Sequence, residues 1–166
     1  MAVDMFLKLD GIPGESADDA HKSEIDILAW SWGMSQSGTM HIGGGGGSGK
    51  ANFQDLSITK FVDIASPELI KFCSKGSHIA KGWLYIRKAA GDKPLEYMIY
   101  NFEDLIVSSV STGGSGGEDR LTENISLNFR KWWFKYTQQK ETGAEGDKKD
   151  FGFNIAEYKQ WSGAPK

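Results

Sequence analysis

The chain has 166 residues, a formal net charge of −3 and a single cysteine, Cys73. This length favours one domain with a full hydrophobic core, and one cysteine excludes an intrachain disulfide framework. Basic residues are mixed with acidic ones along the chain rather than gathered. Nucleic acid is therefore not expected as a partner, because a phosphate backbone is bound by a basic surface.

The N-terminal segment predicts neither a cleaved signal peptide nor a membrane anchor. Residues Met1–Phe6 lack the basic start and the long apolar stretch of a secretory signal. No apolar run approaches the roughly 18 residues that span a membrane. We therefore expect a soluble protein that is made in the cytoplasm and is not inserted into a membrane.

Patterns of period two dominate the first part of the chain and predict strands. Apolar and polar residues alternate over Val3–Leu9. Over Ile25–Gln36 the even positions are large and apolar, and the odd positions are small: Leu28, Trp30, Trp32 and Met34 against Ala29, Ser31, Gly33 and Ser35. A strand places these two sets on opposite faces. The small face is either covered by the same chain or is a wall against which another molecule packs.

A glycine-rich segment follows, and it resembles a phosphate-binding loop at first sight. Gly44–Lys50 matches G-x-x-x-x-G-K, but Ala51 occupies the place of the Ser or Thr that holds Mg²⁺. The residues after it favour a strand over the helix that such a loop needs. Because successive glycines carry a large ordering entropy, we predict a long, extended loop that stays mobile unless an external contact orders it.

One short helix is predicted at about 66–75, with Ser66 as its N-cap, Pro67 in its first turn and Gly76 as its stop. Leu69, Phe72 and Cys73 would form its apolar face. The remaining predicted elements are strands at Trp83–Lys88 and Leu95–Val110 with a bulge or bend near Glu103-Asp104, a strand from Leu121 through Trp133, a charged loop at Gln138–Asp150 and a last short strand at Phe151–Ile155.

The sequence predicts no catalytic, metal or cofactor site. His21, His41 and His78 lie in separate segments without metal-binding spacing, so surface or capping roles are expected for them. Cys73 is expected to be a core residue. Trp132-Trp133 must point to opposite faces of a strand, which favours one exposed tryptophan, at a protein interface or as a sugar platform.

Seven segments of the chain occur in an order that one protein family shares. They are Glu24–Gly38, the glycine run to Lys50, Gln54–Ser57, Ser66–Leu69, Cys73, Ile86–Ala89 and Val107–Asn124. Together they resemble the Hcp (haemolysin-coregulated) proteins, which are the tube subunits of bacterial type VI secretion systems. The match runs in order from Met1 to about Ile155, and its most specific block is Val107–Asn124.

This resemblance implies a mainly β fold over 1–166, an antiparallel β-barrel-like sandwich with one short flanking helix. It implies six copies closed into a ring, and rings stacked into a hollow tube. A contractile sheath expels the tube, a spike protein caps it, and small effector proteins travel in its lumen. Because this machine exports from the bacterial cytoplasm in one step, a missing signal peptide is compatible with secretion to the exterior or into target cells.

The resemblance also gives three groups of residues a role. Ala29, Ser31 and Gly33 would line the channel and contact effectors. The glycine-rich arm of residues 38–53 would reach a neighbouring subunit or ring and become ordered there; its contact residues are Gly38, Thr39, Met40, His41, Ile42, Gly43, Gly44, Gly45, Gly46, Gly47, Ser48, Gly49 and Lys50. A second loop would contact another ring; it comprises Ser111, Thr112, Gly113, Gly114, Ser115, Gly116, Gly117, Glu118, Asp119 and Arg120.

One segment of this chain departs from the expected family pattern, and the length of its tail limits the functions that we expect. Arg130–Lys135 is bulkier and more basic than the family leads us to expect, which affects packing on that strand. The tail of residues 156–166 is too short for a fused effector domain, so no enzymatic activity is expected. Two alternatives stay open at this point: a carbohydrate- or protein-binding β module without tube assembly, and a nucleotide-binding enzyme.

Overall fold

Two strands of 18 residues, β8 (Leu95–Thr112) and β9 (Thr122–Gln139), form the frame of the fold. The computed structural model describes residues 3–41, 43, 49–88 and 93–163. The other elements are β1 (Val3–Leu9), β2 (Ile25–Asp26), β3 (Ala29–Ser31), β4 (Met34–Ser35), β5 (Asn52–Phe53), β6 (Leu56–Phe61), α1 (Ala65–Lys75), β7 (His78–Lys88), β10 (Glu145–Asn154) and β11 (Lys159–Gln160).

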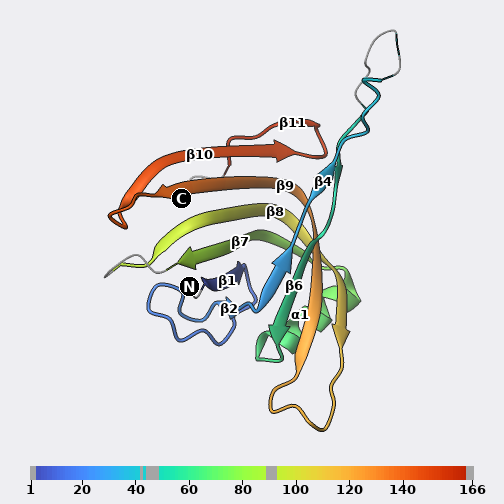
Figure 1. Ribbon diagram of the computed structural model, residues 1–166. Helices are drawn as coiled ribbons and strands as arrows, with labels where there is room; N and C mark the ends of the chain where they lie inside the picture. The colour runs from blue at the N-terminus through green and yellow to red at the C-terminus, as the bar shows by residue number, and fades with distance from the viewer. Residues whose placement is uncertain (1–2, 42, 44–48, 89–92, 164–166) are drawn as a thin grey trace.

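The strands form one branched antiparallel sheet that folds over itself. Its main path runs β11-β10-β9-β8-β7-β1-β2, and β6 attaches to the first half of β9 and carries β3 on its other side. Figure 1 shows β8 and β9 passing from one layer into the other, with α1 beside the layer that contains β6. The core lies between the layers, where Phe102, Leu105 and Leu127 are fully buried. The predicted mainly β fold with one short helix is confirmed.

Helix α1 begins one residue earlier than predicted, and Ser66 is not its N-cap. The N-cap is Ile64, whose side chain makes no capping bond. Gly76 ends the helix as predicted: it adopts the left-handed conformation that glycine favours. Leu69 is buried, and Phe72 packs against the core with Cys73, so the predicted apolar face is confirmed.

A buried ion pair fixes the start of α1 to the sheet. Lys60 of β6 is completely buried, and its Nζ lies 2.6 Å from Glu123 Oε1 of β9 and 2.8 Å from Asp63 Oδ1. Ser66 donates its hydroxyl proton to the same Glu123 oxygen and accepts the Asp63 N–H. Because a buried charge is tolerated only when it is paired, this cluster holds β6, β9 and the helix in one arrangement.

The segment Ile25–Gln36 is not the single strand that its alternation predicts. It is broken into β2, β3 and β4, and the side that faces the core changes at the first break. Ile27 is buried before the break and Trp30 packs inward after it. Consequently Leu28 and Met34, which were predicted to be inward, are 42% and 48% exposed. The predicted alternation therefore holds from Ala29 to Trp32, since the Trp32 ring also packs against the core.

The charged segment Gln138–Asp150 is a hairpin rather than the predicted loop. Strand β9 continues to Gln139, β10 begins at Glu145, and only residues 140–144 connect them. Strand β10 lies near the edge of the sheet, where charged side chains protect an exposed strand from pairing with other chains. The lysines and carboxylates of β10 are therefore compatible with an edge strand, although this charged composition had predicted a loop. The predicted distortion near Glu103-Asp104 is confirmed, because Asp104 has a φ of 52°.

Both tryptophans of the pair Trp132-Trp133 are buried, which corrects the expectation of an exposed one. Trp132 faces the core, and Trp133 faces the other side of the sheet. The segment after β11 covers Trp133, with Gly163 packed closely on its indole. The Trp133 indole N–H also donates to Asp150 Oδ2 at 2.8 Å. A tail that is short in sequence is therefore long enough to cover a second hydrophobic face.

Candidate functional site

Eight small or uncharged polar side chains form two rows across four adjacent strands. In one row Ser31 of β3 lies opposite Ser57 of β6, which lies opposite Ser126 of β9, which in turn lies opposite Ser109 of β8. The second row has the same strand order and consists of Ala29, Thr59, Asn124 and Ser111. We call these eight residues the small-residue wall. They line a shallow hollow of about 370 Å³.

The wall follows from the alternation of side chains along each strand. In β6 the inward neighbours of Ser57 and Thr59 include Ile58, which is buried, and in β9 Ile125 is buried between two wall residues. Since successive residues of a strand point to opposite faces, the wall side chains lie on the outer face of this layer. This layer of the sheet thus has the hydrophobic core on one face and a continuous surface of small side chains on the other.

Hydrogen bonds hold the wall side chains to one another. Thr59 donates its hydroxyl proton to Asn124 Oδ1 at 2.8 Å, and the hydroxyls of Ser109 and Ser126 form a short hydrogen bond. Asp55, at the margin, accepts from Ser108 at 2.6 Å. The wall itself carries no charge and no long side chain. It offers a smooth, weakly polar surface and no nucleophile paired with a base.

The layer that carries the wall has two strand edges without a partner in the described part of the chain. Among the described residues, strand β3 pairs only with β6, and β8 has no strand partner besides β9 once its pairing with β7 ends at Ile106. Unpaired backbone N–H and C=O groups on such an edge are a template for pairing with another chain. The wall is therefore bounded on both sides by edges that can bind a further strand.

The glycine-rich arm leaves the body as a narrow antiparallel ribbon. Met34 pairs with Phe53 and Ser35 with Asn52, and Figure 1 shows the ribbon projecting beyond the rest of the molecule. Strands β4 and β5 therefore flank the glycine run, as predicted, and the element directly after it is a strand rather than a helix. The predicted contact residues at positions 42 and 44–48 lie outside the described residues; Lys50 at the base packs over the ring of Tyr158.

Gly33 lies apart from the wall, and of the second predicted loop only Ser111 belongs to the wall. Gly33 is at the junction with the arm, where its carbonyl accepts the Gln54 N–H at 3.0 Å, and it does not line the hollow. Of the predicted ring-contact residues, Ser111 and Thr112 end β8, and the others connect β8 to β9. Arg120 lies over the ring of Phe61 at 3.8 Å. Figure 1 shows this connection at the end of the molecule opposite the arm.

Comparison with known proteins places these features in a family. The model of the family "Type VI secretion system effector, Hcp" matches residues 6–136. Protein hcp1 of Pseudomonas aeruginosa is 55% identical over 156 residues, which is 93% of this chain and 96% of that protein. This chain belongs to the Hcp family.

Solved structures of Hcp proteins share the fold along almost the whole chain. Hcp1 from Salmonella typhimurium is 41% identical, with a TM-score of 0.81 over 97% of this chain and 100% of that one. A structure described as a type six secretion system protein is 35% identical and gives a TM-score of 0.90 over 96% and 100% of the two chains. The fold predicted from the resemblance is confirmed.

As an Hcp protein, the chain is a secreted tube component of the type VI secretion system and a structural protein rather than an enzyme. The alternative of a nucleotide-binding enzyme is thereby wrong, and β5 after the glycine run gives the physical reason, since a phosphate cradle needs a helix there.

Within the described ranges no helix is long and apolar enough to cross a membrane. Nor does any group of three or more His, Cys, Asp or Glu among these residues form a metal site.

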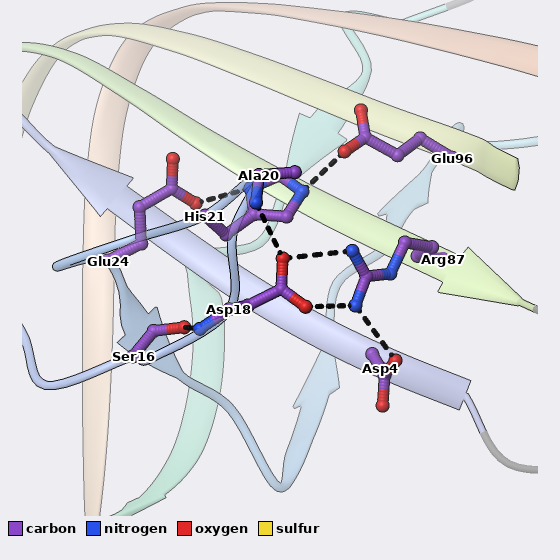
Figure 2. Close-up of polar contacts among 8 residues, drawn as sticks. All are labelled: Asp4, Ser16, Asp18, Ala20, His21, Glu24, Arg87 and Glu96. Carbon is purple, nitrogen blue, oxygen red and sulfur yellow. Dashed lines mark hydrogen bonds and ion pairs between the residues drawn. The ribbon is translucent and has the colours of Figure 1, made fainter. Parts of the chain in front are cut away.

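A second polar cluster, away from the wall, joins the segment after β1 to the sheet (Figure 2). Arg87 of β7 donates to both oxygens of Asp18, at 3.0 and 2.5 Å, and to Asp4 of β1 at 3.1 Å. His21 is buried and bridges two carboxylates: Nδ1 lies 2.7 Å from Glu24, and Nε2 makes a short contact with Glu96. The surface or capping role predicted for this histidine is wrong, whereas His41 and His78 are exposed.

Asp18 makes this cluster sensitive to acid. Its hydrogen bonds from Arg87 lower the pKa of the carboxyl to about 2 from 3.8. A lowered folded-state pKa adds stability above the unfolded value, and this is lost as the pH falls from about 4 to 2. We expect Asp18→Asn to reduce the free energy of unfolding by about 1 kcal/mol at pH 7, since the carboxylate is 25% exposed and partly screened.

Urea unfolding of the wild type and Asp18→Asn at pH 7, 4 and 2.5 checks this expectation. The difference between the two proteins should shrink toward the lowest pH. A difference of the same size at all three values would show that the charge of Asp18 does not contribute.

Most of the wall was missed by sequence reasoning, which identified only Ala29 and Ser31 as wall residues and assigned Ser111 to a ring contact. The signal was present, because small or amide side chains also occupy alternate positions at Ser57 and Thr59, at Ser109 and Ser111, and at Asn124 and Ser126. What the sequence lacks is the register that brings these pairs side by side.

Proposed function

We propose that six copies of this chain close into a ring, that rings stack into a tube, and that the small-residue wall lines the channel. The tube carries small effector proteins and shields them during export. A contractile sheath drives it and a spike protein caps it, so the protein is made in the bacterial cytoplasm and delivered outside the cell. The observation that carries this proposal is the uncharged wall between two unpaired strand edges.

Ring closure is supported by the two edges of the wall layer. They belong to different strands, β3 and β8, so an edge-to-edge contact between copies joins unlike surfaces. A head-to-tail contact of this kind produces a closed ring when its rotation divides a full turn. Pairing of β3 with β8 of the next copy would extend the two rows of the wall from one subunit to the next.

Stacking is supported by the positions of the arm and of the β8–β9 connection at opposite ends of the molecule (Figure 1). An arm that leaves one end of a subunit can meet the opposite end of a subunit in the next ring. Repetition of this contact leaves both ends of the assembly open, which produces a tube rather than a closed particle.

Transport of effectors is supported by the chemistry of the wall. Serine, threonine, asparagine and alanine side chains offer hydrogen bonds without charge and without large protruding groups. Such a surface has little to repel a folded protein of either charge, and it binds weakly enough to release it. Cargo of differing shape therefore fits the same channel.

The variant Ser31→Gln tests the proposed channel wall. A longer side chain in the first row is expected to leave rings intact and to reduce the amount of effector that co-purifies with them, because it fills the hollow. Co-expression with the effectors of the same secretion system, followed by ring purification, measures both properties. Thr142→Gln, in the exposed β9–β10 turn, is the matched control and should retain effector.

Two results would contradict the placement of Ser31 in the channel. Loss of rings in Ser31→Gln would place this residue at a subunit interface. Unchanged effector retention, with intact rings, would mean that cargo does not contact the wall.

A further inference from the structure

The base of the arm is attached to the C-terminal segment by Tyr158. The hydroxyl of Tyr158 accepts the backbone N–H of Ala51 at 2.7 Å. The Nζ of Lys50 lies 5.4 Å from the centre of the same ring, within the range of a cation–π contact. One side chain, distant by more than a hundred positions in the sequence, thus contacts two successive residues of the arm.

Tyr158 is itself held firmly. It lies in the turn between β10 and β11, in which Asn154 pairs with Lys159 and accepts the Glu157 N–H. Its φ of 53° is in the left-handed region, which a non-glycine residue adopts only when its surroundings enforce it. Its ring packs edge-to-face on Phe153, with centroids 5.0 Å apart. The hydroxyl is therefore presented to the arm at a fixed position.

The arm has its other anchor where it joins the core. The Trp32 indole donates to the Gln54 carbonyl at 2.7 Å, and Phe53 packs on Trp132 and Phe153. Ala51 is the first residue beyond β5 in the direction of the tip. Its N–H is taken by Tyr158 rather than by the opposite strand of the ribbon. Two anchors only a few residues apart fix the direction of the arm, whereas one anchor alone would allow the arm to pivot.

The close approach within the ribbon continues past Tyr158 toward the tip. At Gly49 a Cβ atom would lie 2.5 Å from Ser37 Oγ, so the two sides of the arm are in contact there. A change of direction at Ala51 would therefore move both sides of the arm together.

We propose that Tyr158 is a positioning residue for the arm: it fixes the direction in which the base of the arm, at Gly49 and Lys50, leaves the body and so prepares the arm for its contact with another ring. This inference rests on the stacking function proposed above. Binding by a pre-oriented segment loses less conformational freedom than binding by a free one. The hydroxyl of Tyr158 thereby strengthens stacking without touching the neighbouring ring.

The variant Tyr158→Phe removes the hydroxyl and keeps the ring, its packing on Phe153 and the backbone. We expect the Ala51 amide to exchange hydrogen about five times faster, because one neutral hydrogen bond contributes about 1 kcal/mol, and stacking to weaken by about the same factor. Ring formation should be unchanged. Tyr136→Phe, on the partly exposed tyrosine of β9, is the control and should change neither property.

Two measurements test this inference. Mass spectrometry on single rings measures hydrogen exchange in the peptide that contains residues 49–53. Light scattering measures how strongly the rings stack. Unchanged exchange in Tyr158→Phe would overturn the inference, whatever the stacking. Faster exchange with unchanged stacking would overturn it as well, since the direction of the arm would then not matter. If the wild type itself forms no stacks, the proposed function fails, and the exchange result still decides whether Tyr158 holds the arm.

Discussion

Replacement of Lys60 by Ala is expected to destabilise the protein by about 3–5 kcal/mol, because it leaves the buried carboxylate of Glu123 without its cation. Glu123 is 1% exposed, and its Oε2 already has no hydrogen-bond partner. Water cannot reach the carboxylate to replace the ammonium group. Urea unfolding at a fixed protein concentration measures the loss, since assembly of copies adds to apparent stability.

The double variant Lys60→Met, Glu123→Leu is the control for this experiment. It removes both charges of the fully buried pair and retains most of the buried volume, and such replacements are close to neutral in other proteins. Asp63, the other partner of Lys60, is 10% exposed and keeps the hydrogen bond from the Ala65 N–H. We therefore expect it to recover most of the stability that Lys60→Ala loses. A loss below about 1 kcal/mol in Lys60→Ala would mean that the interior around Glu123 is open to solvent.

Shortening of the arm is expected to abolish tubes and to leave rings intact. Replacement of residues 38–48 by an Asn-Gly turn keeps β4, β5 and the wall but removes the part that would reach another ring. Asn-Gly suits a tight turn between two antiparallel strands. Negative-stain electron microscopy of the two proteins at equal concentration compares the lengths of their particles.

A second shortened protein shows whether the arm has a specific role. Replacement of residues 140–144, the β9–β10 turn, by the same Asn-Gly pair changes an exposed loop elsewhere and should leave stacking unaffected. Tubes formed by the arm-shortened variant would contradict a role of the arm in stacking, and rings lost in this variant would move its role to ring closure.

Local patterns in the sequence predicted those parts of the fold that neighbouring residues determine. Gly76 ends the helix because its left-handed conformation is a property of glycine itself. Trp30 packs inward in β3 with Ala29 and Ser31 outward, since alternation is intrinsic to a strand. The strands on both sides of the glycine run were likewise predicted from their composition.

Features that depend on distant parts of the chain could not be predicted. Lys60 and Glu123 look like surface residues of two strands, and only the pairing of β6 with β9 brings them together beneath α1. Trp133 is buried because the C-terminal segment folds over it. His21 is buried because the rings of Phe6 and Tyr85 pack on it, and Glu96, 75 residues away, contacts its Nε2. Each case is a long-range contact that no local pattern reports.

The candidate site likewise combines features that local sequence predicts with features that depend on distant parts of the chain. Alternation indicated the small face of β3, but the wall needs the register of β3, β6, β9 and β8, which local sequence specifies only weakly. Lys50 was predicted to contact another copy of the chain, which stays a prediction; within one chain its ammonium group lies over the ring of Tyr158. The family resemblance supplied the arm and the channel as functions, and the structure supplied the side chains on which both proposals rest.

The mass and shape of the unmodified protein in solution test the central claim most directly. Light scattering combined with electron microscopy should find particles of six times the chain mass of 18.3 kDa or of multiples of that value. The images should show rings with an open centre, alone or stacked. A protein that stays monomeric at high concentration, with no rings in the images, would contradict the proposed tube.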